Sequence, residues 1–267
     1  MECVGNPGRD LCTASDEAEI RKTHHKYGYY LDKCLYNQVV NLFSNRPDTL
    51  VEFLGSRYLG KAGTFVKGRN GPIHCFLLDH IMMQDIVDVS SSGDHAWCRM
   101  RALMQAGTHN SIEKDFSMGH RQWWEGGLYE NEYVKEDGVW KLCRYRYFPF
   151  WHADFETGWS KTKPNYVPWP ARRFPEDPTG PDEILERKML WPDTRVVMFH
   201  YPHPVTGERI NSGHLRAPKY GEGVQEGCKE PLVLELPGGK KWEGAEERES
   251  KKGEKVLPEL VQAKLEE

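Results

Sequence analysis

The first part of the chain places apolar and aromatic residues at helical spacing. A helix is predicted to begin near Thr13 or Ser15, because acidic residues follow at once and the helix dipole favours them in the first turn. Large side chains then recur at steps of three and four residues and predict one buried stripe: Ile20, His24, Tyr27, Leu31 and Leu35. A second, shorter helix is predicted from about Asn37 to Phe43, ahead of the sequence Asn45-Arg46-Pro47.

From residue 50 onward the pattern becomes that of β-strands. Short extended segments are predicted at 50–54 and 56–59, followed by a small helix after Gly60-Lys-Ala-Gly63. A long apolar run over 73–89 predicts a strand that extends or bends. Residues 95–107 alternate between apolar and polar, which predicts one buried and one solvated face. The predicted buried face comprises Ala96, Cys98, Met100, Ala102, Met104 and Ala106.

Two further strands, 123–134 and 139–150, are predicted to form a hairpin. They meet at Glu136-Asp137-Gly138, where aspartate and glycine accept the positive φ of a tight turn. Gly126-Gly127 interrupts the first strand, which is typical of a bend, a bulge or the close approach of a ligand. Helices followed by a run of strands indicate an α+β domain. A curved sheet lined with aromatic side chains would form the wall of a pocket.

Beyond about Phe155 the composition changes. Thirteen of the seventeen prolines lie between Pro164 and Pro258, and proline neither donates to a sheet ladder nor sits inside helices. We therefore predict four regions: a loose leader over 1–14, a domain over 15–155, an extended proline-rich arm over 156–238, and a charged, mobile tail over 239–267. The arm is expected to pack on the domain or on a neighbouring subunit.

Charge and composition narrow the possible functions. A net charge of −4 gives no general electrostatic reason to bind nucleic acid. No apolar run approaches the ~18 residues that span a bilayer, and no secretory signal is visible at the N-terminus. Seven cysteines without CxxC spacing favour free thiols in a reducing compartment, so we expect a cytoplasmic protein.

Several motifs that would identify other activities are missing or incomplete. The sequence has no GxGxxG, P-loop or GxSxG motif, which argues against nucleotide binding and serine-hydrolase chemistry. His24 and His25 are adjacent and would point about 100° apart on a helix, which makes a poor chelating pair. His200 and His203 alternate with prolines and have no cysteine or carboxylate cluster beside them. We predict neither a metal site nor a cofactor.

Four motifs follow one another along the chain: Tyr27-Gly-Tyr-Tyr-Leu-Asp32, Val39-Val-Asn-Leu-Phe43, His80 after Leu77-Leu-Asp79, and Asp137-Gly-Val-Trp-Lys141. This ordered set resembles the NTF2-like superfamily, and within it the SnoaL-like branch with its scytalone dehydratase and ketosteroid isomerase relatives. The resemblance covers residues 15–155. It implies a cone-shaped α+β barrel, a curved mixed sheet wrapped on N-terminal helices, with a ligand pocket in the cone. Enzymes of this family usually use acid–base chemistry without a cofactor.

The resemblance also implies candidate catalytic residues. Tyr27 falls where the isomerase branch has its oxyanion-binding tyrosine, whereas Asp32 and His80 fall at active-site positions of scytalone dehydratase. The second catalytic histidine of scytalone dehydratase would fall near Ala106, and its pocket serine and asparagine at Gly127 and Tyr129. Scytalone dehydration itself is therefore not expected.

Each of the three candidate catalytic residues also has an ordinary structural interpretation. Asp32 could be a surface aspartate that pairs with Lys33 or caps the next helix, although Gly28 one turn earlier would leave space above its carboxylate. His80 could be a satisfied core histidine, and Tyr27 a core tyrosine. As catalytic groups, Asp32 and His80 would share proton transfer, and Tyr27 would donate to a developing oxyanion.

A second group of candidates would line the substrate. Strand alternation places Trp123, Glu125, Gly127 and Tyr129 on one face, where they could form a stacking surface with a second carboxylate. The alternative is that the face of Trp124 and Leu128 is buried and the first face pairs with a neighbouring subunit. Two further wall candidates are Tyr58 and Trp151.

These features favour a cofactor-independent lyase that dehydrates, or cleaves by a retro-aldol step, a small hydroxylated and aromatic substrate. Isomerisation of the same compounds and a non-catalytic ligand-binding or protein-docking module are the alternatives. A catalytic pocket predicts that Asp32 and His80 lie within one bridging ligand or water of each other. A docking module predicts an exposed apolar groove with the two residues apart. We expect a homo-oligomer, a dimer or else a trimer.

Overall fold

The structure is a computed structural model that describes residues 7–61, 72–115, 119–168, 172–185, 190–192, 196–210, 235–236 and 240–241. The chain divides into two units, residues 1–220 and 221–267. In the second unit, β8 (Glu235–Leu236) pairs antiparallel with β9 (Lys240–Lys241). The predicted helix after Gly60 and the predicted mobile tail lie almost entirely outside the described residues.

Helix α1 (Pro7–Asp32) begins earlier than its sequence pattern predicts. Part of the predicted leader is therefore helical. Proline suits the first turn of a helix, since its φ is already helical and its missing N–H is not needed there. The predicted stripe is buried through its first three members, because Ile20, His24 and Tyr27 are at most 1% exposed.

The stripe ends before Leu35. Cys34 adopts a left-handed φ of 53°, and the backbone N–H of Leu35 donates to the carbonyl of Tyr30 at 2.9 Å. This Schellman-type closure ends α1 at Asp32 and leaves Leu35 outside the helix, 41% exposed. A short helix, α2 (Tyr36–Asn41), follows where the second helix is predicted.

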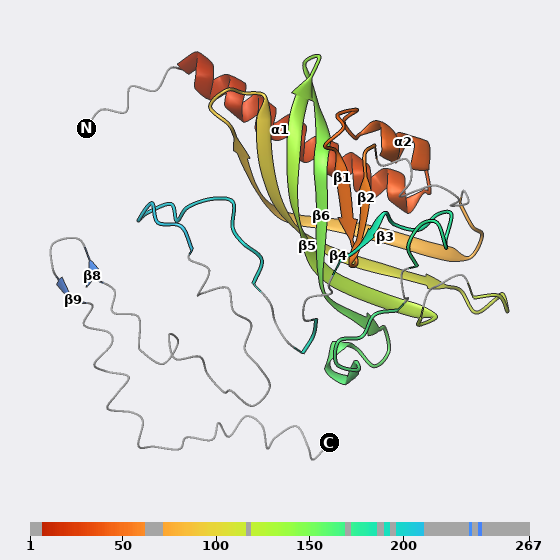
Figure 1. The fold of residues 1–267 in the computed structure, drawn as a ribbon. Helices are drawn as coiled ribbons and strands as arrows, with labels where there is room; N and C mark the ends of the chain where they lie inside the picture. The colour runs from red at the N-terminus through yellow and green to blue at the C-terminus, as the bar shows by residue number, and fades with distance from the viewer. Residues whose placement is uncertain are drawn as a thin grey trace, which may run out of the picture. The chain divides into compact units, whose positions relative to one another are not determined.

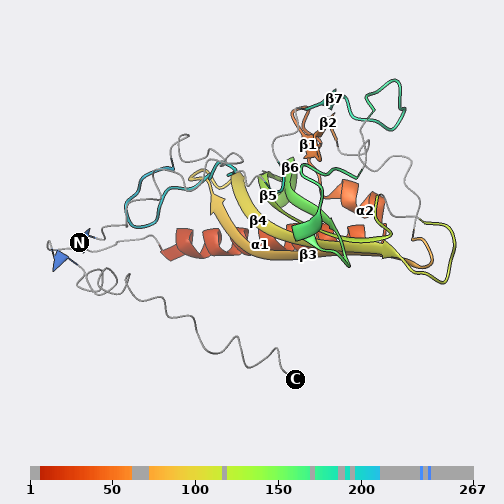
Figure 2. The same ribbon diagram turned by 90° about the horizontal axis from the view of Figure 1, so that it is seen from below.

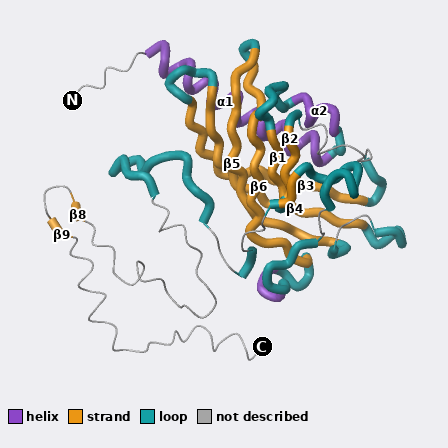
Figure 3. The backbone as a smooth tube through the Cα atoms, viewed as in Figure 1, coloured by secondary structure: helices purple, strands orange, loops and turns teal. Residues whose placement is uncertain are grey.

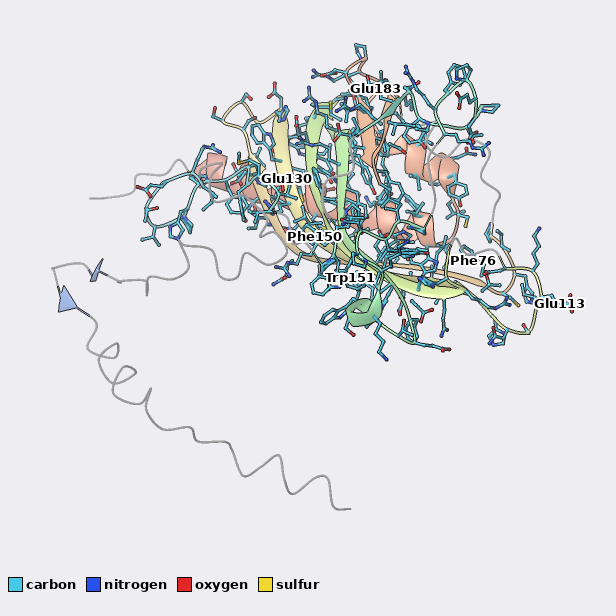
Figure 4. The ribbon with its side chains drawn as sticks, turned by 60° about the horizontal axis from the view of Figure 1, so that its bottom comes forward. Phe76, Glu113, Glu130, Phe150, Trp151 and Glu183 are labelled. Atoms are coloured by element: carbon cyan, nitrogen blue, oxygen red, sulfur yellow. The ribbon has the colours of Figure 1, made fainter. Side chains whose placement is uncertain are left out.

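The described strands of the first unit form one seven-stranded sheet (Figures 1 and 3). Its strands are β1 (Leu50–Phe53), β2 (Ser56–Leu59), β3 (Phe76–Val89), β4 (His95–Thr108), β5 (Gln122–Glu136), β6 (Val139–Asp154) and β7 (Glu183–Ile184). They lie in the order β3-β4-β5-β6-β1-β2-β7, and only the β1–β6 pairing among them is parallel. The sheet is therefore mixed. Within the described residues it remains open, with Phe76 and Glu183 on its two edge strands (Figure 4).

The sheet curves along α1, which packs against β3 and also against β6 (Figure 2). Three β-bulges shift the strand register, between Met83 and Asp85, between Gly126 and Gly127, and between Glu132 and Tyr133. Bulges bend a strand and increase its twist, so these irregularities favour a curved sheet. The hairpin turn is the predicted one, with positive φ at Asp137 and Gly138.

We call the side of the sheet that faces α1 the inner face, and the opposite side the outer face. The inner face includes Met100 and Tyr129, which are cross-strand partners; the Tyr129 ring lies 4.7 Å from that of His24 on α1. The predicted buried face of β4 is confirmed as its inner face, whose side chains are buried or half-buried: Ala96, Cys98, Met100, Ala102, Met104 and Ala106. The opposite face is less solvated than predicted, since Arg101 is its one exposed residue between Trp97 and Gly107. None of the described helices is long and apolar enough to cross a membrane.

The described parts of the proline-rich region contact the sheet at several points. Strand β7 pairs with β2, and Arg57 forms an ion pair with Glu183 at 2.6 Å. Farther along, Arg99 on the outer face donates to the carbonyls of Val197 and Met198. The arm also contains a short 3-10 helix, η2 (Trp159–Lys161). Contact between the arm and a neighbouring subunit stays a prediction.

Candidate active site

Asp32 occupies the last turn of α1, a position that local electrostatics disfavours. The C-terminal end of a helix carries partial negative charge, so a carboxylate there costs about 0.3–1 kcal/mol. No basic residue in the same turn offsets it. A residue that conflicts with its local environment must be stabilised by other contacts, and such conflicts concentrate at functional sites.

His80 supplies those contacts from β3. The Oδ1 atom of Asp32 accepts the backbone N–H of His80 at 2.9 Å and lies 2.6 Å from its ring Nδ1. Strand β3 is an edge strand, and this backbone hydrogen bond satisfies a donor that no neighbouring strand reaches. The side chains are 7% exposed at His80 and 12% at Asp32. The structure thus brings together two of the residues predicted to be catalytic.

The arrangement defines how the imidazole can work. A carboxylate only accepts hydrogen bonds, so Nδ1 carries a proton and donates it to Asp32. The Nε2 atom is then the ring nitrogen that can accept a proton from a ligand and later release it. A carboxylate that orients an imidazole and stabilises its protonated form is a recurrent device for general acid–base catalysis.

A row of inner-face residues crosses the sheet from His80. His80 is the cross-strand partner of Met104, Met104 is the partner of Glu125, and Glu125 is the partner of His152. Glu125 and His152 are only 1% and 3% exposed, and Nδ1 of His152 lies 3.1 Å from Oε2 of Glu125. A second carboxylate–imidazole pair therefore occupies the same face as Asp32 and His80.

Tyrosines fill the inner face beside this row. The hydroxyls of Tyr27 and Tyr145 are 2.7 Å apart, and the ring of Tyr129 lies 5.3 Å from that of Tyr145. Burial raises the pKa of Tyr129 well above its usual range, and the Tyr27 hydroxyl and the carboxylates of Glu125 and Asp32 add to the rise. Burial likewise raises the pKa of Tyr145. These phenols stay protonated at neutral pH and can act as hydrogen-bond donors.

The glycines near the site admit neighbouring groups. A Cβ on Gly28 would lie 3.2 Å from Cε of Met82 and 3.3 Å from the carbonyl of His80. The space predicted above Asp32 is therefore filled by β3, because glycine lets the helix approach the strand. A Cβ on Gly127 would lie 2.7 Å from the hydroxyl of Tyr147, so this glycine makes room for an aromatic side chain.

The predicted wall residues separate into three groups. Trp123, Glu125 and Tyr129 lie on the inner face and are at most 4% exposed. Trp151 is the partner of Gly126 and covers it on the outer face, near the end of β6 (Figure 4). Tyr58 packs against the core from β2, near the other edge of the sheet.

His152 is a candidate that the sequence pattern did not single out. The predicted strand ends at residue 150, whereas β6 continues to Asp154 and therefore includes His152. The sequence signal that could have found it is the alternation of side chains along a strand, which places His152 on the same face as Glu125.

Among the described residues, no group of three or more His, Cys, Asp or Glu side chains is arranged to hold a metal ion.

The chain resembles several solved structures at low sequence identity. A candidate scytalone dehydratase from Novosphingobium aromaticivorans is 19% identical over 54% of this chain and 89% of its own, with a TM-score of 0.42. LinA is 16% identical over 55% of this chain and 94% of its own, with a TM-score of 0.45. ActVI-ORFA from Streptomyces coelicolor is 13% identical over 50% and 96%, with a TM-score of 0.40.

A comparison with curated proteins finds no match. The sequence model of the SnoaL-like domain, in contrast, matches residues 13–146. This range contains most of α1, all of α2, the strands from β1 to β5, and the first half of β6. It also contains Asp32, His80 and Glu125. The chain therefore belongs to the SnoaL-like domain family of the NTF2-like superfamily.

Proposed function

We propose that this protein is a cofactor-independent lyase that eliminates water from, or cleaves by a retro-aldol step, a small hydroxylated aromatic compound. The observation that carries the proposal is the pair of hydrogen bonds from His80 to Oδ1 of Asp32. Membership of the SnoaL-like family supports chemistry without a cofactor. The aromatic side chains of the inner face support a substrate that contains a ring.

Both reactions begin with proton removal by Nε2 of His80. In dehydration, the proton leaves the carbon beside a carbonyl group, and the β-hydroxyl departs with a second proton as water. In retro-aldol cleavage, the proton leaves the hydroxyl, the carbon–carbon bond breaks, and the enolate fragment takes up a proton. Asp32 holds the ring in position and stabilises the imidazolium that forms.

Tyr27 is proposed to stabilise the oxyanion. Its hydroxyl lies next to that of Tyr145, whose pKa is raised by burial, so Tyr145 can donate to Tyr27 while Tyr27 donates to the substrate. Hydrogen bonds in such a chain polarise one another, and a donor in a site with little water is especially effective.

Isomerisation and a non-catalytic module remain the alternative functions. An isomerase would use the same base but return the proton to another carbon. A docking module would leave Asp32 and His80 apart, and their direct hydrogen bond favours an enzyme. The homo-oligomer and the cytoplasmic location also remain predictions.

The aldol of benzaldehyde and acetone is a suitable probe, because its dehydration product and its cleavage product absorb at different wavelengths. Wild-type protein should convert it, and His80→Gln should lower turnover by about 10²–10⁴-fold. His25→Gln, on the exposed side of α1, is the matched control and should retain wild-type turnover. Full activity in His80→Gln would remove the catalytic assignment, whereas binding without turnover by wild-type protein would favour a non-catalytic module.

A further inference from the structure

The pair formed by Glu125 and His152 is unusual for its depth. Both side chains are almost fully buried, and Nδ1 of His152 lies 3.1 Å from Oε2 of Glu125. Burying an ionisable carboxyl group is costly even when it is paired. Proteins with apolar side chains of similar volume at such positions are often more stable. Buried ionisable pairs that face an interior are therefore candidates for function.

The surroundings of His152 include a polar group that is left without a partner. The Trp123 ring lies 4.5 Å from the ring of His152 and is only 4% exposed. Among the described residues, no hydrogen-bond acceptor is available to its indole Nε1–H. Buried donors are normally satisfied, so this N–H is suited to an oxygen atom of a ligand. A ligand oxygen held there would lie beside His152.

The two carboxylate–imidazole pairs lie on the same face of the sheet but on different strands, β3 and β6. Three strand spacings lie between His80 and His152, which puts their backbones on the order of 14 Å apart along the row. This separation is too large for direct proton transfer between the two rings. Met104 lies in the same row between them and is only half-buried. A ring-bearing substrate above Met104 could contact both imidazoles with different atoms.

From this geometry we propose that Glu125 and His152 form a second acid–base pair, in which Nε2 of His152 protonates the departing hydroxyl of the substrate. The inference rests on the proposed lyase function and assigns the two proton transfers to different histidines. His80 takes the proton from carbon while His152 gives one to oxygen, so the carbon–oxygen bond breaks and water leaves. Glu125 holds the ring through Nδ1 throughout.

Both histidines must then be reset. His80 has gained a proton and His152 has lost one, so the net charge of the site is unchanged by one turnover. His120 stacks 6.3 Å from His152 and pairs with Asp154 at 3.5 Å, and its side chain is 33% exposed. It lies where solvent can return a proton towards His152. His80 loses its extra proton at its own partly accessible end of the row.

The test compares two leaving groups. A hydroxyl group must be protonated to leave as water, whereas an acetoxy group leaves readily as acetate without protonation. With the benzaldehyde–acetone aldol, His152→Gln should slow elimination by about 100-fold or more. With the acetate ester of the same aldol, it should retain at least a fifth of wild-type turnover. His80→Gln should be slow with both compounds, because both lose a proton from carbon. Equal losses on the two compounds in His152→Gln would overturn the proposal.

Glu125→Gln provides a second variant if His152→Gln does not fold, with thermal unfolding and circular dichroism as checks on both. Glu125→Gln should show the same selective loss with the hydroxyl compound. If wild-type protein converts neither compound, the proposed lyase function fails. The proposal of a second acid–base pair is then tested by nitrogen NMR of the histidine rings. Perturbation of both His80 and His152 by the aldol would support a shared site, whereas perturbation of His80 alone, or of neither ring, would overturn it.

Discussion

Asp32 and His80 are joined by two hydrogen bonds that meet at one oxygen atom. Oδ1 of Asp32 receives the backbone N–H of His80 at 2.9 Å and faces the ring Nδ1 at 2.6 Å. The bond to the backbone fixes the carboxylate relative to β3, and the second bond fixes the ring relative to the carboxylate. Both hydrogen bonds are accepted by an oxygen atom, so the neutral side chain of an asparagine at this position could accept them as well.

Asp32→Asn should separate charge from geometry. The amide oxygen of asparagine can accept both hydrogen bonds, so the ring of His80 should keep its orientation. The negative charge of the carboxylate, which stabilises the protonated ring, is lost. We expect turnover of the aldol probe to fall by about 10²–10⁴-fold. The free energy of unfolding should change by no more than about 1 kcal/mol, because the lost charge-assisted bond and the relieved helix dipole oppose each other. Steady-state kinetics and urea denaturation measure the two effects.

Asp79→Asn is the matched control, since Asp79 precedes His80 on the same strand but bonds to Gln105 at 2.8 Å on the outer face. It should keep wild-type turnover. Comparable losses in Asp32→Asn and Asp79→Asn would indicate a general effect on β3 and contradict a catalytic role for Asp32.

Much of the fold follows from local patterns that the sequence displays. The helical stripe of α1, the alternation of β4 and the Asp137-Gly138 turn each depend on neighbouring residues, and the structure contains all three. The end of α1 was less visible, because Cys34 adopts a left-handed conformation that is uncommon for a residue with a side chain. Periodicity alone therefore continued the stripe to Leu35.

The partner of Glu125 could not be predicted in the same way. Unbroken pairing from the turn, where Glu136 pairs with Val139, would place Glu125 opposite Phe150. Two bulges each shift the register by one residue, and the partner becomes His152. Residues 150 and 152 lie on the same face of a strand, so unbroken pairing predicts the correct face of β6 opposite Glu125 but the wrong partner residue. Bulge positions depend on packing, as at Gly127 beneath Tyr147, and this contact is not local in sequence.

His24 should make the protein sensitive to acid. Its ring is fully buried, and its Nδ1 lies 2.8 Å from the hydroxyl of Tyr133. Burial, with a smaller contribution from His25, lowers its pKa from 6.5 to about 3. The unfolded chain therefore binds a proton between these values that the folded chain excludes. This contribution to stability is complete above about pH 6.5 and is lost as the pH falls towards 3.

At pH 5 the loss from His24 amounts to about 2 kcal/mol. His24→Gln removes the titration while keeping an acceptor for Tyr133, so its free energy of unfolding should depend less on pH between 7 and 5 than that of wild-type protein. His25→Gln, which changes an exposed histidine one residue away, should keep the wild-type slope. Denaturant titrations at several pH values measure the slopes, and parallel curves for wild type and His24→Gln would refute the assignment.

Gly127→Ala should destabilise the sheet at the bulge. An added Cβ would lie 2.5 Å from the carbonyl oxygen of Phe148 and 2.7 Å from the hydroxyl of Tyr147. A backbone oxygen cannot rotate away as a flexible side chain can, so we expect a loss of about 1–3 kcal/mol in the free energy of unfolding. Gly138→Asn, at a φ of 78° with open space around the position, should cost at most a few tenths of a kcal/mol. Thermal and chemical denaturation of both variants tests the contrast.

Arg99 should hold the proline-rich arm on the outer face. Its guanidinium donates to the carbonyls of Val197 and Met198, lies 4.1 Å from the Phe199 ring centre, and pairs with Glu130 at 3.3 Å. Arg99→Ala removes these contacts at once. We expect backbone amides in 196–201 to exchange with solvent about tenfold faster or more, because local opening becomes easier by roughly 1–3 kcal/mol. Arg101→Ala removes an exposed arginine two residues along the same face and should leave exchange in the arm unchanged. Equal protection of 196–201 in both variants would show that other contacts, such as the pairing of His200 with Asp88 at 2.9 Å, are sufficient to hold the arm.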